Sequence, residues 1–102
     1  MTASPIIERV AQVVGALKTT ARVDVFQFGS TLVENAPWWD VDILLVCACE
    51  SDRALARKGL AELCDQFPID LTIMAAQEEA ELDFIRSQGC RWLASTSVAT
   101  SL

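Results

Sequence analysis

Three aspartates and a glycine-serine pair are the residues of this chain whose types and spacing could support chemistry. Asp40 and Asp42 stand two residues apart at the beginning of Val41 to Cys47, a near-continuous apolar run typical of a strand covered on both faces. Side chains two apart on a strand project from the same face. A carboxylate in such a place is costly unless a cation or strong hydrogen bonds compensate it. Because hard oxygen ligands suit Mg²⁺, the pair predicts a metal site.

The third aspartate, Asp70, lies near the start of another apolar segment, Ile69 to Met74. A helix between the two strands predicts parallel neighbours with a right-handed crossover, which would bring Asp70 beside the pair. Three bare carboxylates repel one another and raise one another's pKa values, and divalent cations relieve that repulsion. The three aspartates therefore predict bound Mg²⁺, with two ions expected.

The glycine-serine pair, Gly29-Ser30, supplies the phosphate half of the predicted site. Glycine lets a phosphate approach the backbone, and Ser30 offers a hydroxyl and an N–H. Nucleotidyl transfer requires such a turn beside carboxylate-held Mg²⁺, where one ion activates the attacking oxygen and the other steadies the leaving pyrophosphate.

The elements that must position these residues follow from hydrophobic periodicity and from capping signals. We expect helices over residues 5–19, from a cap at Ser51 or Asp52 to Pro68, and over Gln77–Ser87, with strands over Val23–Phe28, Val41–Cys47, Ile69–Met74 and Cys90–Leu93. The main order, helix-strand-strand-helix-strand-helix, predicts an α/β (α+β) domain with a small mixed sheet and flanking helices. Residues 1–93 are expected to form this single domain, and the small, polar residues 94–102 a flexible tail.

Charge and composition limit the classes of function. The net charge of −6 argues against passive binding to a nucleic-acid backbone, although carboxylate-held metal ions can still attract phosphates. The absence of histidine removes Ser-His and Cys-His nucleophile activation. The four cysteines lack the C-x-x-C spacing of a zinc site and are expected to be reduced, mostly buried thiols: Cys47, Cys49, Cys64 and Cys90. No apolar run could span a bilayer and no secretory signal is visible, so we expect a cytoplasmic protein.

Taken in order, the Gly-Ser pair, a spacer of nine residues, Asp-x-Asp and a later strand aspartate resemble the nucleotidyltransferase superfamily of DNA polymerase β. Within it, the chain is most similar to the minimal nucleotidyltransferases of bacteria and archaea. The likeness covers roughly residues 5–93 and implies the nucleotidyltransferase fold. Each of these motifs occurs often by chance. The specificity of the resemblance comes from the order of the motifs and from their positions on the expected strands and turn.

The resemblance implies a role for each site residue. Gly29 and Ser30 would hold the β- and γ-phosphates of a nucleoside triphosphate, with ATP as the substrate. Asp40 and Asp42 would ligate two Mg²⁺ ions, and Asp70 would complete the metal that activates the acceptor hydroxyl. Relatives of this size often belong to toxin–antitoxin pairs and add AMP to a partner HEPN-type ribonuclease. The resemblance therefore implies a protein partner as acceptor.

The segment after the Gly-Ser pair departs from many relatives, which carry an arginine and a glycine there. Here it reads Thr31-Leu32-Val33-Glu34, and no cationic side chain lies between Ser30 and Asp40. Trp38 and Trp39, just before Asp40, could stack a base, pack over the sheet edge or contact a partner. An alternative function is therefore a catalytically weak or inactive module of the same fold that binds and blocks a partner protein.

Two further alternatives stay open. The aspartates could be structural, capping loops or pairing with Arg22 or Arg91 at the rim of the sheet. Template-directed or tailing synthesis on nucleic acid is disfavoured by the acidic composition and by the lack of a thumb-like extension. The base preference, the identity of the acceptor and homo-oligomerisation are open at this level.

Overall fold

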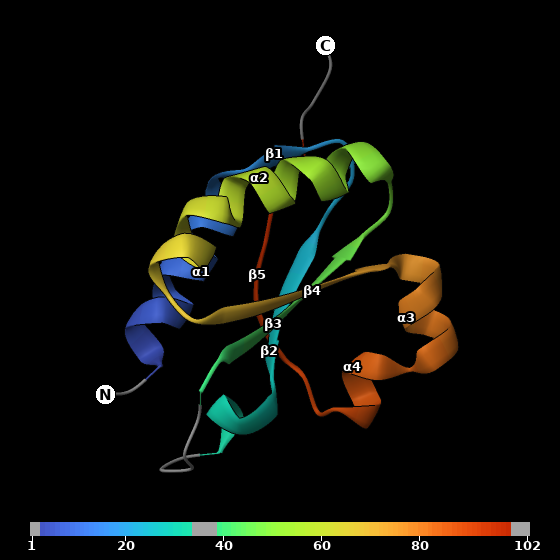
Figure 1. Ribbon diagram of the computed structural model, residues 1–102. Helices are drawn as coiled ribbons and strands as arrows, with labels where there is room; N and C mark the ends of the chain where they lie inside the picture. The colour runs from blue at the N-terminus through green and yellow to red at the C-terminus, as the bar shows by residue number, and fades with distance from the viewer. Residues whose placement is uncertain (1–2, 34–38, 99–102) are drawn as a thin grey trace.

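A four-stranded mixed sheet lies at the centre of the protein, and the computed structural model describes the chain over residues 3–33 and 39–98. In spatial order its strands are β4 (Ile69–Ala75), β3 (Val41–Cys47), β2 (Asp24–Phe28) and β5 (Arg91–Ser95). Two pairs of helices lie on opposite sides of the sheet (Figure 1): α1 (Ser4–Ala16) with α2 (Glu50–Gln66), and α3 (Ala76–Leu82) with α4 (Phe84–Ser87). The predicted α/β class, a small mixed sheet with flanking helices, is confirmed.

The strands that carry the aspartates are parallel neighbours, as predicted. Helix α2 returns the chain from the end of β3 to the start of β4, and the two strands pair without a break in register from Val41 opposite Ile69 to Cys47 opposite Ala75. The remaining pairs, β3 with β2 and β2 with β5, are antiparallel. This register places Asp42 directly opposite Asp70.

The first face of the sheet packs against α1 and α2 and contains most of the hydrophobic core. Alternate strand residues such as Val25, Ile43 and Leu45 have no solvent exposure and contact apolar side chains of the two helices, including Val10 and Leu60. Each such side chain contributes about 1.5–3 kcal/mol on burial. This packing fixes the position of β2 and β3 against the two helices.

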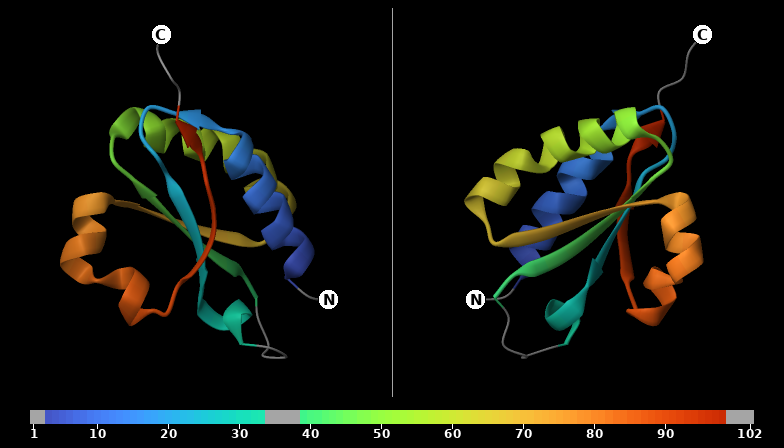
Figure 2. Two further views of the ribbon diagram at one scale, coloured as in Figure 1. Left: turned by 180° about the vertical axis from the view of Figure 1, so that it is seen from behind. Right: turned by 45° about the vertical axis from the view of Figure 1, so that its right-hand side comes forward.

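The second face of the sheet carries the residues that alternate with these core-facing ones along each strand. One cross-strand row runs Thr72, Leu44, Phe26 and Trp92, and the next runs Asp70, Asp42 and Phe28. Helices α3 and α4 lead the chain from β4 at one edge to β5 at the other (Figure 2). On the way, Phe84 meets Phe28 edge to face with ring centroids 5.1 Å apart. The aspartates therefore share this face with an aromatic pair.

The C-terminal segment differs from the flexible tail that composition predicts. Ala94 and Ser95 belong to β5, and β6 (Ser97–Val98) pairs in parallel with β1 (Lys18–Thr19). The hydroxyl of buried Thr96 accepts a hydrogen bond from the N–H of Val23 (3.0 Å) and lies 2.6 Å from the hydroxyl of Thr19. These bonds join residues more than 70 positions apart, so composition could not reveal them. Residues 99–102 lie outside the described residues.

The helices differ from prediction at their ends. The first ends at Ala16 rather than residue 19, because Lys18 and Thr19 form β1. Ala3 occupies its N-cap, and Cys49 rather than Ser51 or Asp52 occupies that of α2. The helix expected over 77–87 is broken at Asp83, whose left-handed φ of 50° separates α3 from α4. Among the described residues, no helix is both long and apolar enough to cross a membrane.

Candidate functional site

The candidate site lies where β3 and β4 begin and β2 ends. Asp42 and Asp70 occupy paired positions on adjacent parallel strands, and Phe28 occupies the position opposite Asp42 on β2. Side chains at paired positions of a sheet project from the same face. The structure therefore brings together two of the three predicted carboxylates through backbone register alone.

Gly29 is adapted to the carboxylate of Asp42. Its φ of 80° lies in the left-handed region that side chains rarely adopt, and a Cβ at this position would overlap Asp42 Oδ2. Because Gly29 has no side chain, the carboxylate of Asp42 can occupy this space. The predicted glycine and aspartate are in direct proximity although 13 positions separate them in the sequence, from 29 to 42.

Ser30 follows in a short 3-10 helix, η1 (Gly29–Leu32), and is exposed to solvent. A buried glutamine at the end of β2 anchors this turn, because Gln27 Nε2 donates a hydrogen bond to Thr31 Oγ1 at 2.9 Å. The C=O of Ser30 accepts from the N–H of Val33 at 3.1 Å. Ser30 is therefore an exposed residue on the turn that contacts Asp42. Sequence reasoning missed Gln27, whose signal was a polar residue at a core-facing position of β2.

The electrostatics of Asp42 are those of a carboxylate without a compensating cation. Partial burial raises the pKa of Asp42, and the negative charges of Asp70 and then Asp40 raise it further. In the described part of the chain, the ion pairs within 4.0 Å are Arg22–Asp24, Arg53–Glu50 and Arg86–Asp83. The alternative in which Arg22 neutralises one of the three predicted aspartates therefore receives no support, since Arg22 pairs with Asp24.

Asp40 is exposed in the bend before β3 and is close enough for its charge to affect Asp42. Within residues 3–33 and 39–98, however, no three acidic, cysteine or histidine side chains converge closely enough to hold a metal ion. The donors still suit Mg²⁺, which keeps several waters and is commonly bound by one or two carboxylates together with substrate phosphates. Asp42 and Asp70 would hold such an ion, and Asp40 stands beside them.

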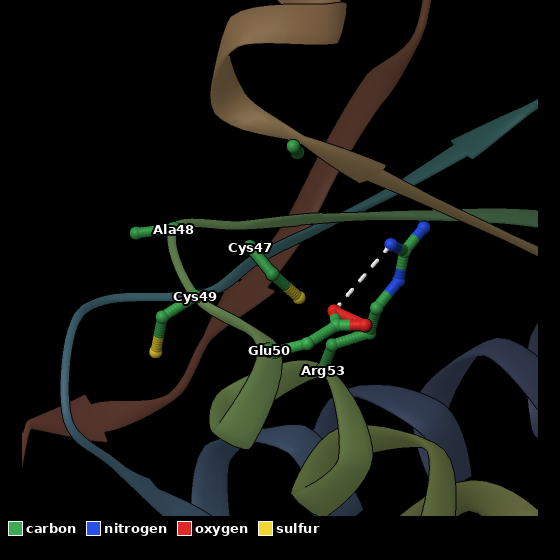
Figure 3. A pocket seen from close by; sticks show the side chains of 6 residues that line it. Cys47, Ala48, Cys49, Glu50 and Arg53 are labelled. Carbon is green, nitrogen blue, oxygen red and sulfur yellow. Dashed lines mark ion pairs between the residues drawn. The ribbon is translucent and has the colours of Figure 1, made fainter.

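A separate cavity of about 280 Å³ lies at the other end of β3, away from the aspartates. Its lining comes from the ends of β3 and β4 and the start of α2 (Figure 3): Cys47, Ala48, Cys49, Glu50, Arg53 and Ala75. The guanidinium of Arg53 lies 3.7 Å from Glu50 and donates to the C=O of Ile73 at 2.7 Å. Because the one carboxylate among these lining residues, that of Glu50, lies in the ion pair with Arg53, this cavity is a poorer candidate for metal-dependent chemistry than the aspartate site.

The cysteines fit the expectation of free thiols, and all four are unbridged. Cys47 is buried, which raises the pKa of its thiol, whereas Cys49 is exposed and its sulfur points away from that of Cys47 in Figure 3. The expectation that the thiols are mostly buried is wrong: Cys64 and Cys90 are half-buried, and Cys49 is exposed because the strand ends before it, at Cys47.

Trp39 is 89% exposed next to Asp40 and Val33 is 62% exposed at the end of η1. Packing of Trp39 over the sheet edge is therefore excluded, and base stacking or partner contact stays open. Trp38 lies outside the described residues.

Comparison with known proteins identifies no relative. No family model matches the chain, and neither curated proteins nor solved structures show a significant match to it. The assignment of function therefore rests on the geometry of the aspartates and of the turn at Gly29.

Proposed function

We propose that this protein is a Mg²⁺-dependent nucleotidyltransferase that transfers a nucleoside monophosphate, AMP from ATP, to a hydroxyl group of a partner protein. The observation that supports this most is the contact between Gly29 and Asp42 together with the register that sets Asp42 opposite Asp70. A glycine turn against one carboxylate of a pair suits the binding of a metal-chelated phosphate.

Each residue has a distinct role in this proposal. Gly29 lets the carboxylate of Asp42 lie against the backbone of the turn, and Ser30, exposed on the same turn, would donate a hydrogen bond to a phosphate bound there. Asp42 and Asp70 would hold Mg²⁺, with Asp40 joining them when substrate is bound. Asp70 is exposed and placed to accept the proton of an incoming hydroxyl. Bound Mg²⁺ supplies charge neutralisation for the triphosphate.

The raised pKa of Asp42 is consistent with such a role. A carboxylate that burial and two like charges disfavour as an anion gains more from a bound cation than an isolated surface carboxylate does. The chain has no cationic side chain between Ser30 and Asp40, so metal, backbone N–H groups or an Arg or Lys distant in sequence would meet the phosphate charge.

The test is calorimetric titration of ATP into the protein with Mg²⁺ and then with EDTA. We expect binding that requires Mg²⁺ and is lost in Asp42→Asn. Asp65→Asn is the matched control, because it removes the same charge from an exposed position near the end of α2. Circular dichroism would establish that both variants are folded.

Two results would overturn the proposal: no ATP binding by folded wild type in Mg²⁺, or equal binding by wild type and Asp42→Asn. Loss of binding in both variants would point to net charge rather than to the site. Mg²⁺-dependent binding that only Asp42→Asn loses would justify a search for the acceptor with labelled ATP.

The second candidate function is a non-catalytic module that binds and blocks a partner protein. The exposure of Trp39 favours it, because exposed tryptophans are frequent anchors of protein interfaces. This function predicts a complex that survives both EDTA and Asp42→Asn but is lost in Trp39→Ala. Dependence of the complex on Mg²⁺ would count against it.

A further inference from the structure

Among the described residues, no strand pairs with the outer edge of β4. β4 ends the sheet on one side, and the N–H and C=O of successive strand residues point alternately to opposite sides. The C=O of Pro68 accepts from the N–H of Val41 at 2.8 Å, so it points towards β3. By alternation, Asp70, Thr72 and Met74 also face β3, which leaves the odd-numbered residues of β4 facing outward.

Some of these outward groups are engaged within the chain. The N–H of Ile69 donates to the C=O of Phe67 (2.8 Å), the C=O of Ile73 accepts from Arg53 (2.7 Å), and the N–H of Ala75 donates to Glu78 (3.1 Å). Ala75 is also the N-cap residue of α3, where its C=O accepts the first bond of the helix. Among the described residues, four outward groups lack a partner: the N–H and C=O of Leu71, the N–H of Ile73 and the C=O of Ile69.

We propose that this edge pairs with the same edge of a second copy of the chain, antiparallel and centred on Leu71. In that register the two Leu71 residues exchange both of their hydrogen bonds across a two-fold axis. The N–H of Ile73 in each copy then donates to the C=O of Ile69 in the other copy. All four free groups of each copy are satisfied, and none of the four contacts needs a group that is already engaged.

Side chains support the same register. On the helix-covered face, Ile69, Leu71 and Ile73 pack against the core but stay partly exposed. Pairing centred on Leu71 sets Leu71 against itself and Ile69 against Ile73, which buries apolar surface of both copies. On the other face it sets Asp70 opposite Thr72, whose hydroxyl can donate to the carboxylate. A register centred on Asp70 would instead set two carboxylates face to face.

The other edge of the sheet is protected and β4 is not. β5 pairs with β2 through an irregularity between Val25 and Phe26 and begins with the charged Arg91, and bulges and charges are common protections of exposed edges. β4 runs for seven residues in unbroken register, with Asp70 as its only charge and no proline. The edge that lacks protection is therefore the one suited to pairing.

This interface also has consequences for the candidate site and for salt. Thr72 of the second copy would lie beside Asp70, so each site would lie at the interface, whatever the protein catalyses. Each copy carries a net charge of −6, and like-charged copies repel less as ionic strength rises. The dimer is expected to strengthen with salt.

The first test is sedimentation velocity over a range of protein and salt concentrations, comparing wild type with Leu71→Pro. Proline at this position removes an outward N–H and no bond to β3, and edge strands tolerate proline where the N–H faces solvent. We expect wild type to sediment as a dimer of the 11.1 kDa chain and folded Leu71→Pro as a monomer. A wild type that stays monomeric at all concentrations and salts would overturn the proposal.

The second test does not depend on the folding of the proline variant. Thr72→Glu would set like charges opposite each other at Asp70, and Thr72→Lys would set opposite charges there. Gln88→Glu and Gln88→Lys make the same net-charge changes at an exposed position after α4. We expect the dissociation constants of the two Thr72 variants to differ about tenfold and those of the Gln88 variants to be similar. A dimer indifferent to the sign of charge at position 72 would refute this register.

Discussion

Two aspartates of this protein meet opposite environments. Asp52, on the first turn of α2, is 2% exposed and accepts hydrogen bonds from the backbone N–H groups of Thr20 (2.8 Å) and Ala21 (2.9 Å). These bonds hold the pKa of Asp52 below its ordinary value of 3.8. Asp42 has no such donors among the described residues, and burial together with the charges of Asp70 and Asp40 raises its pKa.

The difference separates a structural carboxylate from a candidate functional one. At Asp52 the fold supplies two donors and uses the side chain to join the loop after β1 to α2, 31 and 32 positions away in sequence. At Asp42 the fold instead adds two like charges and a glycine that lets the carboxylate approach the backbone. Unrelieved repulsion costs stability, and proteins keep such costs mainly where a ligand offsets them.

The largest expected effect is on stability at the structural carboxylate. Asp52→Ala leaves the N–H groups of Thr20 and Ala21 without their acceptor, so the melting temperature should fall on the order of 10 °C. Thermal unfolding followed by circular dichroism measures this. A variant as stable as wild type would mean that the two hydrogen bonds do not join the loop to the helix.

The next effect distinguishes two glycines that share a left-handed backbone. Gly89→Ala, with φ of 60° and open space where the methyl group would lie, should cost about 1–2 kcal/mol. Gly29→Ala adds a methyl that overlaps Asp42 Oδ2, so it should cost more and also abolish Mg²⁺-dependent ATP binding. Urea unfolding and calorimetry give the two readouts. Equal costs and unchanged binding would show that the contact between Gly29 and Asp42 is unimportant.

At the candidate site, removal of charge should stabilise the protein. Asp42→Asn removes a carboxylate that Asp70 and Asp40 repel, so in EDTA its melting temperature should rise by about 2–5 °C. Addition of Mg²⁺ should raise the melting temperature of wild type and leave that of Asp42→Asn unchanged. Destabilisation by Asp42→Asn in EDTA would place Asp42 with the structural carboxylates.

The smallest expected effect is a pH dependence of opposite sign at the two aspartates. The contribution of Asp52 is complete above pH 3.8 and is lost as pH falls through its lowered pKa. The folded state binds the proton of Asp42 more tightly than the unfolded state does, so its contribution falls as pH rises from 3.8 through its raised pKa. Unfolding free energies from pH 3 to 6, for wild type and each variant, should therefore differ in opposite directions. If the unfolding free energies of the Asp52 and Asp42 variants depended on pH in the same way, the two carboxylates would not differ in the way described.

Much of the sheet could be predicted from the sequence because it depends on local pattern. The run Val41–Cys47 is apolar throughout most of its length and forms β3 with the predicted bounds. A helix-length segment between two apolar runs predicts a parallel pair, and β3 and β4 are parallel. Pairing of strands that both begin just before an aspartate then sets Asp42 opposite Asp70. The predicted third member, Asp40, stands before β3 and does not complete a metal-binding group in the described residues.

What the sequence did not reveal depends on contacts between distant segments. The hydroxyl contact between Thr19 and Thr96, and the bonds from Thr20 and Ala21 to Asp52, link parts of the chain that no periodicity relates. The same is true of the left-handed break at Asp83. From sequence alone, polar residues such as Asp52 and Thr96 are expected to face solvent, because their distant hydrogen-bond partners are not known.

The sequence by itself determined the class of fold, the parallel pair of strands and the identity of the candidate carboxylates, because hydrophobic alternation and helix length act locally. Only the tertiary structure decided which carboxylate is compensated and which is not. That depends on where N–H donors and like charges from other segments lie: two amides reach Asp52, whereas Asp70 and the turn at Gly29 reach Asp42. The two amides lower the pKa of Asp52, whereas partial burial and then the charges of Asp70 and Asp40 raise that of Asp42.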